Sequence, residues 1–371
     1  MILVVDYNLR DIRFKVFKKK HKKLCTSLLI KYPEEIRDDK DLKRCVSDIV
    51  GKNKLKAISF RILFGGDYFK KTLFIDSKFF KQFEKLVPFF PLYIPSTLVM
   101  LRRFKNVFKE TPLIAFFETS FFSKLPDMEK YYALPFKYYK ISKIRKWGMH
   151  GISHKANFEI STNKEKSISV VLDKQTTVCA ASDRKPLSMS LGYTPLEGIM
   201  SRTACGDLDP GIVFYLMNVY NFSIYKIDEM LKNKSGFVGL TGYDIGLKDM
   251  VKLRGKDDKV NLAFDVYQAQ IMKYIGEGIA ALGGLDNIIF SGSNVSILTP
   301  IVYDIVKKIS FLGINTIALP WFNGTNIMNV TSEDSKIKVY INKTDIARII
   351  FDESEFFYNK VIQKDRFLKF D

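Results

Sequence analysis

The stretch Ser188–Gly211, SMSLGYTPLEGIMSRTACGDLDPG, mixes residues that bend the backbone with residues that carry charge. Its glycines and prolines are Gly192, Pro195, Gly198, Gly206, Pro210 and Gly211. Glycine allows left-handed or closely approaching backbone and proline fixes φ, so we predict a loop here. Between them lie Thr194, Glu197, Arg202, Asp207 and Asp209. Loops on a rigid scaffold carry function, so the stretch is either a site-forming loop or an ordinary surface connection.

The composition indicates a folded protein with an excess of positive charge. The chain has 371 residues, of which 47% are hydrophobic and 27% charged, enough for more than one domain core. It carries 59 Lys+Arg against 40 Asp+Glu, a net charge of +19. This excess favours an acidic partner, namely nucleic acid, an anionic membrane or an acidic protein surface, or else it reflects a lysine-rich solvated surface.

Cysteine usage and hydropathy indicate a reduced, cytoplasmic setting. The four cysteines are Cys25, Cys45, Cys179 and Cys205, and no two of them have CxxC spacing. The N-terminus shows no signal peptide. The long uncharged run Leu86–Leu101 is interrupted by three prolines, whereas a membrane helix needs about 20 apolar residues, so we predict no membrane span.

Apolar periodicity predicts an α/β chain. The expected strands are Met1–Asp6, Ile12–Val16, Leu24–Ile30, Ala57–Phe64, Leu113–Phe117, Ile168–Leu172, Thr177–Ala181, Asn287–Phe290 and Lys336–Ile341. The expected helices are Asp38–Val50, Asp76–Val87, Ser96–Phe108, Ile212–Tyr220, Ile227–Leu231, Val260–Leu282, Thr299–Leu312 and Thr344–Phe351, with an irregular loop at Pro88–Pro95. The basic run Lys18–Lys23 is most simply a hairpin tip, and alternatively a contact for RNA, lipid or protein.

Two features outside the loop also suggest chemistry. Glu118 directly follows a buried strand, and ligands of α/β folds bind at the carboxyl ends of strands. His150 and His154 form an i, i+4 pair between glycines, which predicts either a buried structural pair or a functional histidine. Zinc is disfavoured because no third ligand follows the pattern.

The segments Ser190–Gly198 and Gly206–Gly211 resemble the signature of the acetate kinase (acetokinase) family. Further matching tracts are Phe117–Phe121, Gly148–His154, Ser235–Leu240, Lys273–Gly276, Ala281–Asp286 and Phe311–Ile314. The family phosphorylates acetate with ATP and Mg²⁺ and is homodimeric. The resemblance implies an α/β fold of two ribonuclease H-like domains, of the kind found in sugar kinases, Hsp70 and actin, around a central cleft. We expect an N-terminal domain at 1–140, with a tail at about 346–371 packing back on it, and a C-terminal domain at 141–345.

On the acetate side, the resemblance keeps three groups and loses one. Arg61 matches the substrate arginine, although the histidines that flank it in the family are phenylalanines here. Glu118 stands where the family has its catalytic aspartate, and His150 matches the transition-state histidine. Ala204 replaces the catalytic arginine, and nearby Arg202 is not an obvious substitute.

On the metal and nucleotide side, most family groups are replaced. Asp6 stands for the metal-binding asparagine, Arg13 keeps the cation of the N-terminal motif, and Asp345 is the nearest acid to the C-terminal metal ligand. The remaining family positions for the nucleotide are Val171, Asp173, Lys174, Gln175, Gly246, Lys248, Gly292 and Ser293. The glycines and histidine of the family's phosphate loop are gone from the first four of these, and the Asp173 carboxylate would repel phosphate.

These replacements lead to three hypotheses. In the first, the chain is an acetate kinase-like protein with a degraded ATP site, binding ATP and Mg²⁺ weakly or not at all. It would serve as a structural or regulatory subunit with an acidic protein partner, or as a homodimer or heterodimer. In the second, it is a divergent active carboxylate kinase in which Arg13, Lys174 or Lys248 repairs the phosphate site. In the third, it binds nucleic acid through Lys18–Lys23.

Overall fold

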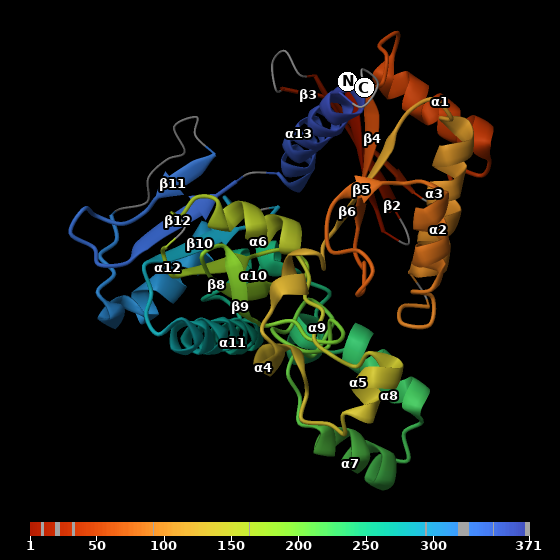
Figure 1. Cartoon of the computed structure of the whole chain (residues 1–371). Helices are drawn as coiled ribbons and strands as arrows, with labels where there is room; N and C mark the ends of the chain where they lie inside the picture. The colour runs from red at the N-terminus through yellow and green to blue at the C-terminus, as the bar shows by residue number, and fades with distance from the viewer. Residues whose placement is uncertain are drawn as a thin grey trace. The chain divides into compact units, whose positions relative to one another are not determined.

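The computed structural model of the chain describes residues 1–8, 11–18, 23–31, 34–91, 93–162, 164–293, 295–317, 326–343 and 345–367 (Figure 1). The chain divides into two compact units. Unit 1 comprises Met1–Ser123 with Asp345–Asp371, and unit 2 comprises Lys124–Thr344. The boundary lies before residue 140, because residues 129–147 are bonded into unit 2, for example through an ion pair between Lys146 and Glu129 and a backbone bond from Trp147 to Gly192.

Unit 1 is built on a six-stranded mixed sheet in the order β3-β2-β1-β4-β6-β5. The strands are β1 (Ile2–Tyr7), β2 (Asp11–Lys18), β3 (Lys23–Lys31), β4 (Ala57–Ile62), β5 (Leu73–Phe74) and β6 (Leu113–Phe117). The central strands β1, β4 and β6 are parallel, while β2, β3 and β5 run antiparallel to their neighbours. The carboxyl ends of β1, β4 and β6 therefore meet at one edge of the sheet.

Helices cover both faces of this sheet. They are α1 (Asp39–Val50), α2 (Ser77–Glu84), α3 (Ile94–Val107) and α13 (Ile346–Phe367), with a 3₁₀ turn at Phe121–Lys124. Phe104 of α3 packs edge-on against Phe14 and Phe60 of the sheet. On the opposite face α13 packs on β1 and β4, and the hydroxyls of Ser354 and Ser59 lie 2.7 Å apart (Figure 1).

Unit 2 repeats the same strand arrangement. Its sheet has the order β11-β12-β10-β7-β8-β9. The strands are β7 (Ser167–Val171), β8 (Thr177–Ser182), β9 (Lys185–Met189), β10 (Asn287–Ser291), β11 (Ile327–Asn329) and β12 (Lys338–Asn342). Here β7, β10 and β12 are the parallel strands. Two α/β units with mixed sheets confirm the predicted fold class.

The helices of unit 2 lie on both faces of its sheet and beyond it. They are α4 (Asp127–Lys130), α5 (Lys137–Ser142), α6 (Gly151–Phe158), α7 (Pro210–Tyr220), α8 (Ile224–Asn233), α9 (Gly236–Thr241), α10 (Leu247–Leu253), α11 (Asp258–Leu282) and α12 (Thr299–Lys308). The long helix α11 packs on β7, β8 and β9, whereas α6 packs on β7 and β10 (Figure 1).

Several of the predicted helices have other bounds in the structure, among them α2, which ends at Glu84, and α8, which runs over Ile224–Asn233. Helix α3 begins at Ile94 and includes Pro95 in its first turn, where the missing N–H of proline is not needed. The predicted helix Thr299–Leu312 ends at Lys308 and continues as a 3₁₀ turn closed by Gly313 at φ +88°. Helix α13 runs to Phe367, well beyond the predicted end, because residues past Phe351 also face the sheet.

The stretch Ser188–Gly211 is largely loop, as predicted: β9 ends at Met189 and α7 begins at Pro210. Two acidic side chains of this loop, Glu197 and Asp207, accept hydrogen bonds from other residues of unit 2. Glu197 accepts a hydrogen bond from Tyr132, and the Asp207 carboxylate accepts from the Gly198 amide at 2.8 Å and from the Tyr274 hydroxyl at 2.7 Å. These bonds assign Glu197 and Asp207 a role in holding the loop together.

Candidate functional site

The carboxyl edge of the unit 1 sheet carries an ionic cluster of Asp6, Arg61 and Glu118. Asp6 lies near the end of β1, Arg61 lies beside it on β4, and Glu118 follows β6. Arg61 Nε donates to Glu118 Oε1 at 2.5 Å, and Arg61 Nη1 lies 3.3 Å from both carboxylate oxygens of Asp6. The Glu118 side chain is 0% exposed, against 14% for Arg61 and 23% for Asp6. The structure therefore brings together three residues that the sequence analysis singled out separately.

The electrostatics of the ionic cluster are set by one cation and two anions. A buried carboxylate is costly unless it is paired and hydrogen-bonded, and the Arg61 guanidinium supplies that pairing to Glu118. The backbone amide of Glu118 donates to the Ile62 carbonyl at 3.0 Å, which fixes the start of its side chain. Any carboxylate ligand that binds Arg61 has to share the guanidinium with Glu118 and Asp6.

The other predicted residues of unit 1 lie apart from this pairing. Arg13 is the cross-strand partner of Asp6 on β2, and its side chain is exposed. Asp345 forms an ion pair with Lys15 and accepts from the Ala347 amide at 2.7 Å at the start of α13. Asp6 and Asp345, the predicted metal ligands, are thus each paired with a cation.

The two predicted metal ligands lie beside cations, and no larger group of ligand side chains surrounds them in the described part of the chain. Within the described ranges, no group of three or more His, Cys, Asp or Glu residues is placed to hold a metal ion. Each of the two predicted acids has a cationic partner, Arg61 for Asp6 and Lys15 for Asp345, with which a bound metal ion would compete.

In unit 2, the two histidines lie in a buried hydrogen-bond network between α6 and the sheet. His150 precedes α6 with a left-handed backbone, φ +59° and ψ 24°, a conformation that histidine tolerates better than most residues. Its Nδ1 lies 2.9 Å from Thr177 Oγ1, and the same oxygen lies 2.9 Å from His154 Nε2. His154 Nδ1 lies 2.7 Å from Ser169 Oγ.

The network continues through an asparagine on the same helix. Asn157 Nδ2 donates to Ser169 Oγ and to Ser291 Oγ, both at 2.8 Å. Asn157 Oδ1 accepts from Asn342 Nδ2 at 2.9 Å. We refer to His150, His154, Asn157, Ser169, Thr177, Ser291 and Asn342 as the histidine network; all seven are buried. They join α6 to strands β7, β8, β10 and β12.

Burial decides the charge state of the second histidine. Burial, and the neighbouring His150, hold the pKa of His154 well below its ordinary value of 6.5, so His154 is neutral at pH 7. Both histidines are buried, and they are joined through one threonine hydroxyl.

Three of the predicted nucleotide positions, Asp173, Lys174 and Gln175, lie in the turn between β7 and β8, and a fourth, Val171, lies just before it. Val171 is the buried last residue of β7. Asp173 Oδ1 accepts from the Ser293 hydroxyl at 3.0 Å and from the Lys174 amide at 2.8 Å. Gln175 donates through Nε2 to the Ile199 carbonyl at 2.8 Å, which ties the turn to the loop after β9. Asp173 and Ser293 are thus brought together at the carboxyl ends of β7 and β10.

The two predicted glycines have different reasons to be glycine. Gly292 has φ +132°, and a β-carbon there would collide with the Leu172 carbonyl, so the backbone needs glycine for packing. Gly246 precedes α10 at φ −109°, and a β-carbon there would meet nothing within 4 Å. Lys248, in the first turn of α10, is exposed.

The position of the missing arginine is nearly buried. Ala204 is 9% exposed, and its amide lies 3.1 Å from Ser201 Oγ. Arg202 forms an exposed ion pair with Asp244 at 2.6 Å. The Arg202 guanidinium is therefore bound to an acid at the surface of unit 2.

Sequence reasoning missed Asn157, Ser169 and Thr177. A signal was present, because the strand SISVV carries hydroxyls inside an otherwise apolar run, and buried hydroxyls need hydrogen-bond partners. The basic run Lys18–Lys23 cannot be assessed, since residues 19–22 lie outside the described residues. Among the described helices, none has the length and apolar composition that crossing a bilayer requires.

Comparison with known proteins places these features in one family. The sequence model of the acetokinase family matches residues 35–352. The acetate kinase of Clostridium novyi (strain NT) is 31% identical over 326 residues, covering 83% of this chain and 81% of that protein. The acetate kinase of Sulfurimonas denitrificans is 33% identical over 305 residues, covering 79% of this chain and 76% of that protein.

Solved structures agree at the level of the fold. The crystal structure of Porphyromonas gingivalis acetate kinase superposes with a TM-score of 0.85 at 22% identity, covering 96% of this chain and 98% of that one. Acetate kinase from Entamoeba histolytica gives a TM-score of 0.83 at 24% identity, with 95% and 98% covered. The sequence match over most of the chain establishes the relationship that the signature in Ser188–Gly211 predicted: this chain belongs to the acetokinase family.

Proposed function

We propose that this chain binds a short carboxylate through Arg61 but transfers phosphate from ATP slowly or not at all. An arginine can bind a carboxylate through two parallel hydrogen bonds, and Arg61 already contacts two carboxylates, Glu118 through Nε and Asp6 through Nη1. The acetate kinases to which the chain is similar suggest acetate or a close relative as the ligand. In this proposal the chain serves mainly as a regulatory or structural subunit.

The main support for low phosphate transfer is the Asp173 carboxylate, which follows β7. The Asp173 carboxylate is held by Ser293 and by the Lys174 amide at positions that the family resemblance assigns to phosphate contacts. Two unit charges about 4 Å apart repel by roughly 1 kcal/mol in water and roughly 4 kcal/mol near a protein surface. Ala204 adds to this loss, because an arginine that stabilises the phosphoryl transition state is worth about 10³-fold or more in rate.

The test combines turnover with nucleotide binding. We expect acetate-dependent ATP use in a coupled assay to be far below the usual enzyme range of about 1 to 10³ s⁻¹. Calorimetry with MgATP is expected to show weak binding that tightens about tenfold in Asp173→Asn, which keeps the shape and removes the charge. Asp183→Asn is the matched control, since the exposed Asp183 follows the other end of β8. Turnover at ordinary rates in the unaltered chain would reject the proposal.

An active carboxylate kinase is the second candidate, and the ionic cluster favours it. Glu118 is fully buried and oriented by Arg61, an arrangement that is costly to keep without a use. If the chain is active, Glu118→Gln should lower kcat strongly, while Arg61→Lys should raise KM for the carboxylate because lysine cannot bind it bidentately. Unchanged activity in Glu118→Gln would exclude this role for Glu118.

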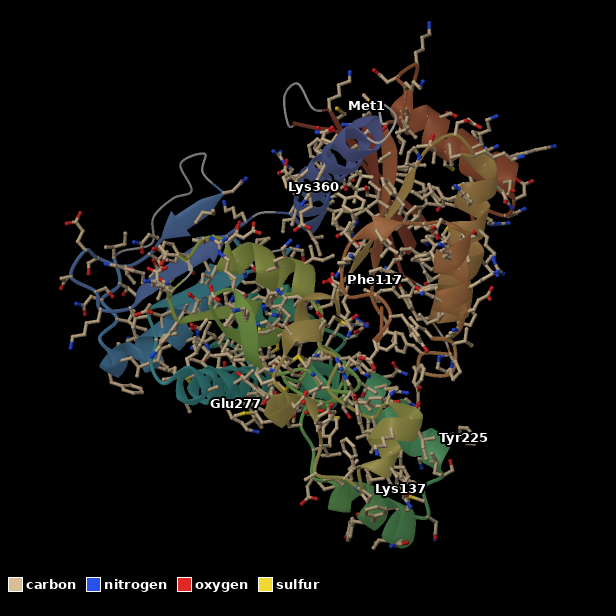
Figure 2. All side chains as sticks on the ribbon, viewed as in Figure 1. Met1, Phe117, Lys137, Tyr225, Glu277 and Lys360 are labelled. Atoms are coloured by element: carbon tan, nitrogen blue, oxygen red, sulfur yellow. The ribbon has the colours of Figure 1, made fainter. Side chains whose placement is uncertain are left out.

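We also propose that a second copy of the chain covers the apolar face formed by α7 and α8. No residue of α7 is buried, and Phe214 is 63% exposed. Tyr225, which Figure 2 labels, lies on α8 and is 87% exposed. Exposed apolar surface of this kind marks protein interfaces. Light scattering is expected to give a dimer mass, and Phe214→Glu with Tyr225→Glu to give a monomer. Phe311→Glu, at an exposed phenylalanine outside this face, is the control. A monomeric unaltered protein would contradict the proposal.

A further inference from the structure

In the histidine network, the donor and the acceptor of each hydrogen bond can be assigned in turn, starting from the Asn157 amide. Asn157 uses both amide hydrogens, one on Ser169 Oγ and one on Ser291 Oγ, while its own carbonyl accepts from Asn342. Ser169 Oγ therefore receives a hydrogen from Asn157. The hydroxyl hydrogen of Ser169 is then available for His154 Nδ1, which lies 2.7 Å away.

This direction passes through both rings. If His154 Nδ1 accepts from Ser169, the proton of the neutral His154 ring lies on Nε2 and is donated to Thr177 Oγ1 at 2.9 Å. The hydroxyl of Thr177 then donates to His150 Nδ1, also at 2.9 Å. A neutral His150 consequently carries its proton on Nε2.

We propose that Asn157 and His154 are positioning residues that hold His150 in its Nε2–H form, so that this ring offers a hydrogen-bond donor to an anionic phosphoryl oxygen and does not act as a base at that nitrogen. The proposal deepens the second candidate function, the active carboxylate kinase, and rests on it, because His150 matches the family's transition-state histidine and would contact the phosphoryl group. A ring with a proton on Nε2 has no lone pair there with which to take another proton.

Two further observations support the proposed direction. Burial keeps His154 neutral, and a doubly protonated His154 would donate from both nitrogens and break the chain of bonds. His150 is buried at the N-terminal end of α6, with its Nδ1 at 2.9 Å from Thr177 Oγ1. The orientation of the Asn157 amide therefore determines the tautomer of the His150 ring, through the hydroxyls of Ser169 and Thr177.

Nitrogen NMR tests the inference directly, because the chain has only three histidines, His21, His150 and His154. Long-range ¹H–¹⁵N spectra of ¹⁵N-histidine-labelled protein distinguish the two tautomers of each ring, and a His21→Gln variant removes the third set of signals. We expect the Nε2–H form for both His150 and His154 in the ligand-free protein. An Nδ1–H form, or a mixture, at His150 would overturn the inference.

A second test reverses the donor and acceptor roles along the network by changing Asn157, which does not contact His150 directly. In Asn157→Asp the amide donors become acceptors, so Ser169 should donate to the new carboxylate and His150 should change to its Nδ1–H form. Asn233→Asp on α8, at an exposed asparagine, is the matched control and should leave both rings unchanged. If Asn157→Asp does not fold, Thr177→Val breaks the link between the rings and should leave His150 as a mixture of tautomers. A His150 that keeps its single form in both variants would contradict the inference.

Titration with inorganic phosphate separates the inference from the function on which it rests. We expect added phosphate to move the His150 Nε2 signal and to leave His154 in place. If His150 is in the Nε2–H form but phosphate does not perturb it, the hydrogen-bond chain is confirmed and the proposed contact with a phosphoryl group is wrong.

Discussion

The two sheets of this protein have the same strand order and strand directions. They differ in the polar side chains at the edge where the parallel strands end. The strands of the two sheets pair in the same way. Strand β1 corresponds to β7, β2 to β8, β3 to β9, β4 to β10, β6 to β12 and β5 to β11. At this edge unit 1 places the charged Asp6, Arg61 and Glu118. Unit 2 has the Asp173 carboxylate there and, beside it, the neutral Thr177, Ser291 and Asn342, which are bonded to groups at or on helix α6.

This difference shows two ways to bury polar groups at a strand end. The ionic cluster balances a buried charge with a countercharge, so removing one member leaves another uncompensated. The histidine network balances donors with acceptors, so removing one member leaves an unsatisfied dipole, at smaller cost. The predictions below test this contrast from the largest expected effect to the smallest.

Removing the cation of unit 1 should cost the most. Arg61→Met leaves the fully buried Glu118 without its partner, and we expect the free energy of unfolding to fall by about 3–5 kcal/mol, measured by urea denaturation. Arg13→Met, an exposed neighbour in the same row of the sheet, should change it by less than about 0.5 kcal/mol. Equal effects of the two substitutions would refute the role assigned to the ionic cluster.

Backbone packing at the edge of unit 2 should come next. Gly292→Ala forces a strained φ and a collision with the Leu172 carbonyl, and we expect a loss of about 3 kcal/mol in the same assay. Gly246→Ala has open space and an ordinary φ, so it should be neutral or stabilise by up to about 1 kcal/mol. A tolerated Gly292→Ala would mean that the approach of these two backbones is not required.

Removing the centre of the histidine network should cost less than removing Arg61. Asn157→Leu leaves the Asn342 amide and two serine hydroxyls without this partner, and we expect a loss of about 2 kcal/mol in urea denaturation. Asn233→Leu, at an exposed site, should be close to neutral. A loss from Asn157→Leu larger than that from Arg61→Met would reverse the proposed ranking of the two edges.

The smallest effect is a pH dependence from His154. Its folded pKa is below the unfolded value near 6.5, so between the two values the unfolded state binds more protons. Stability is therefore fully present above about pH 6.5 and falls with decreasing pH, by at most about 1.4 kcal/mol per pH unit. Burial raises the pKa of Glu277, which acts in the opposite direction at lower pH.

The contribution of His154 is measured by comparing the pH dependence of the unfolding free energy in the unaltered chain and in His154→Gln. Unfolding free energies at pH 5.5 and 7.5 should differ less in His154→Gln than in the unaltered chain, because the titrating ring is gone. A pH slope that is the same in both proteins would show that His154 does not titrate on unfolding.

Much of the fold could be predicted from local sequence. Asp38, Asp76 and Asp257 cap α1, α2 and α11 through bonds to amides two or three residues ahead, so the sequence around each aspartate contains the whole interaction. Alternating and continuous apolar runs likewise predicted most of the strands of both sheets. The short strands β5 and β11 and the strand β9 were missed, because their burial depends on neighbours in the sheet and their sequences lack a clear period.

The sites, in contrast, needed the tertiary structure. The sequence predicted that Asp6 ends a strand, that Arg61 lies within a strand and that Glu118 directly follows one, and it paired two histidines by their i, i+4 spacing. Only the folded sheet, with β4 between β1 and β6, brings Arg61 within bonding distance of acids 55 and 57 residues away. Likewise only the packing of α6 joins Asn157 to Ser291, 134 residues further along the chain. Hydrogen-bond partners within a turn are fixed by spacing, whereas partners on different strands are fixed by strand order, which no short stretch of sequence contains.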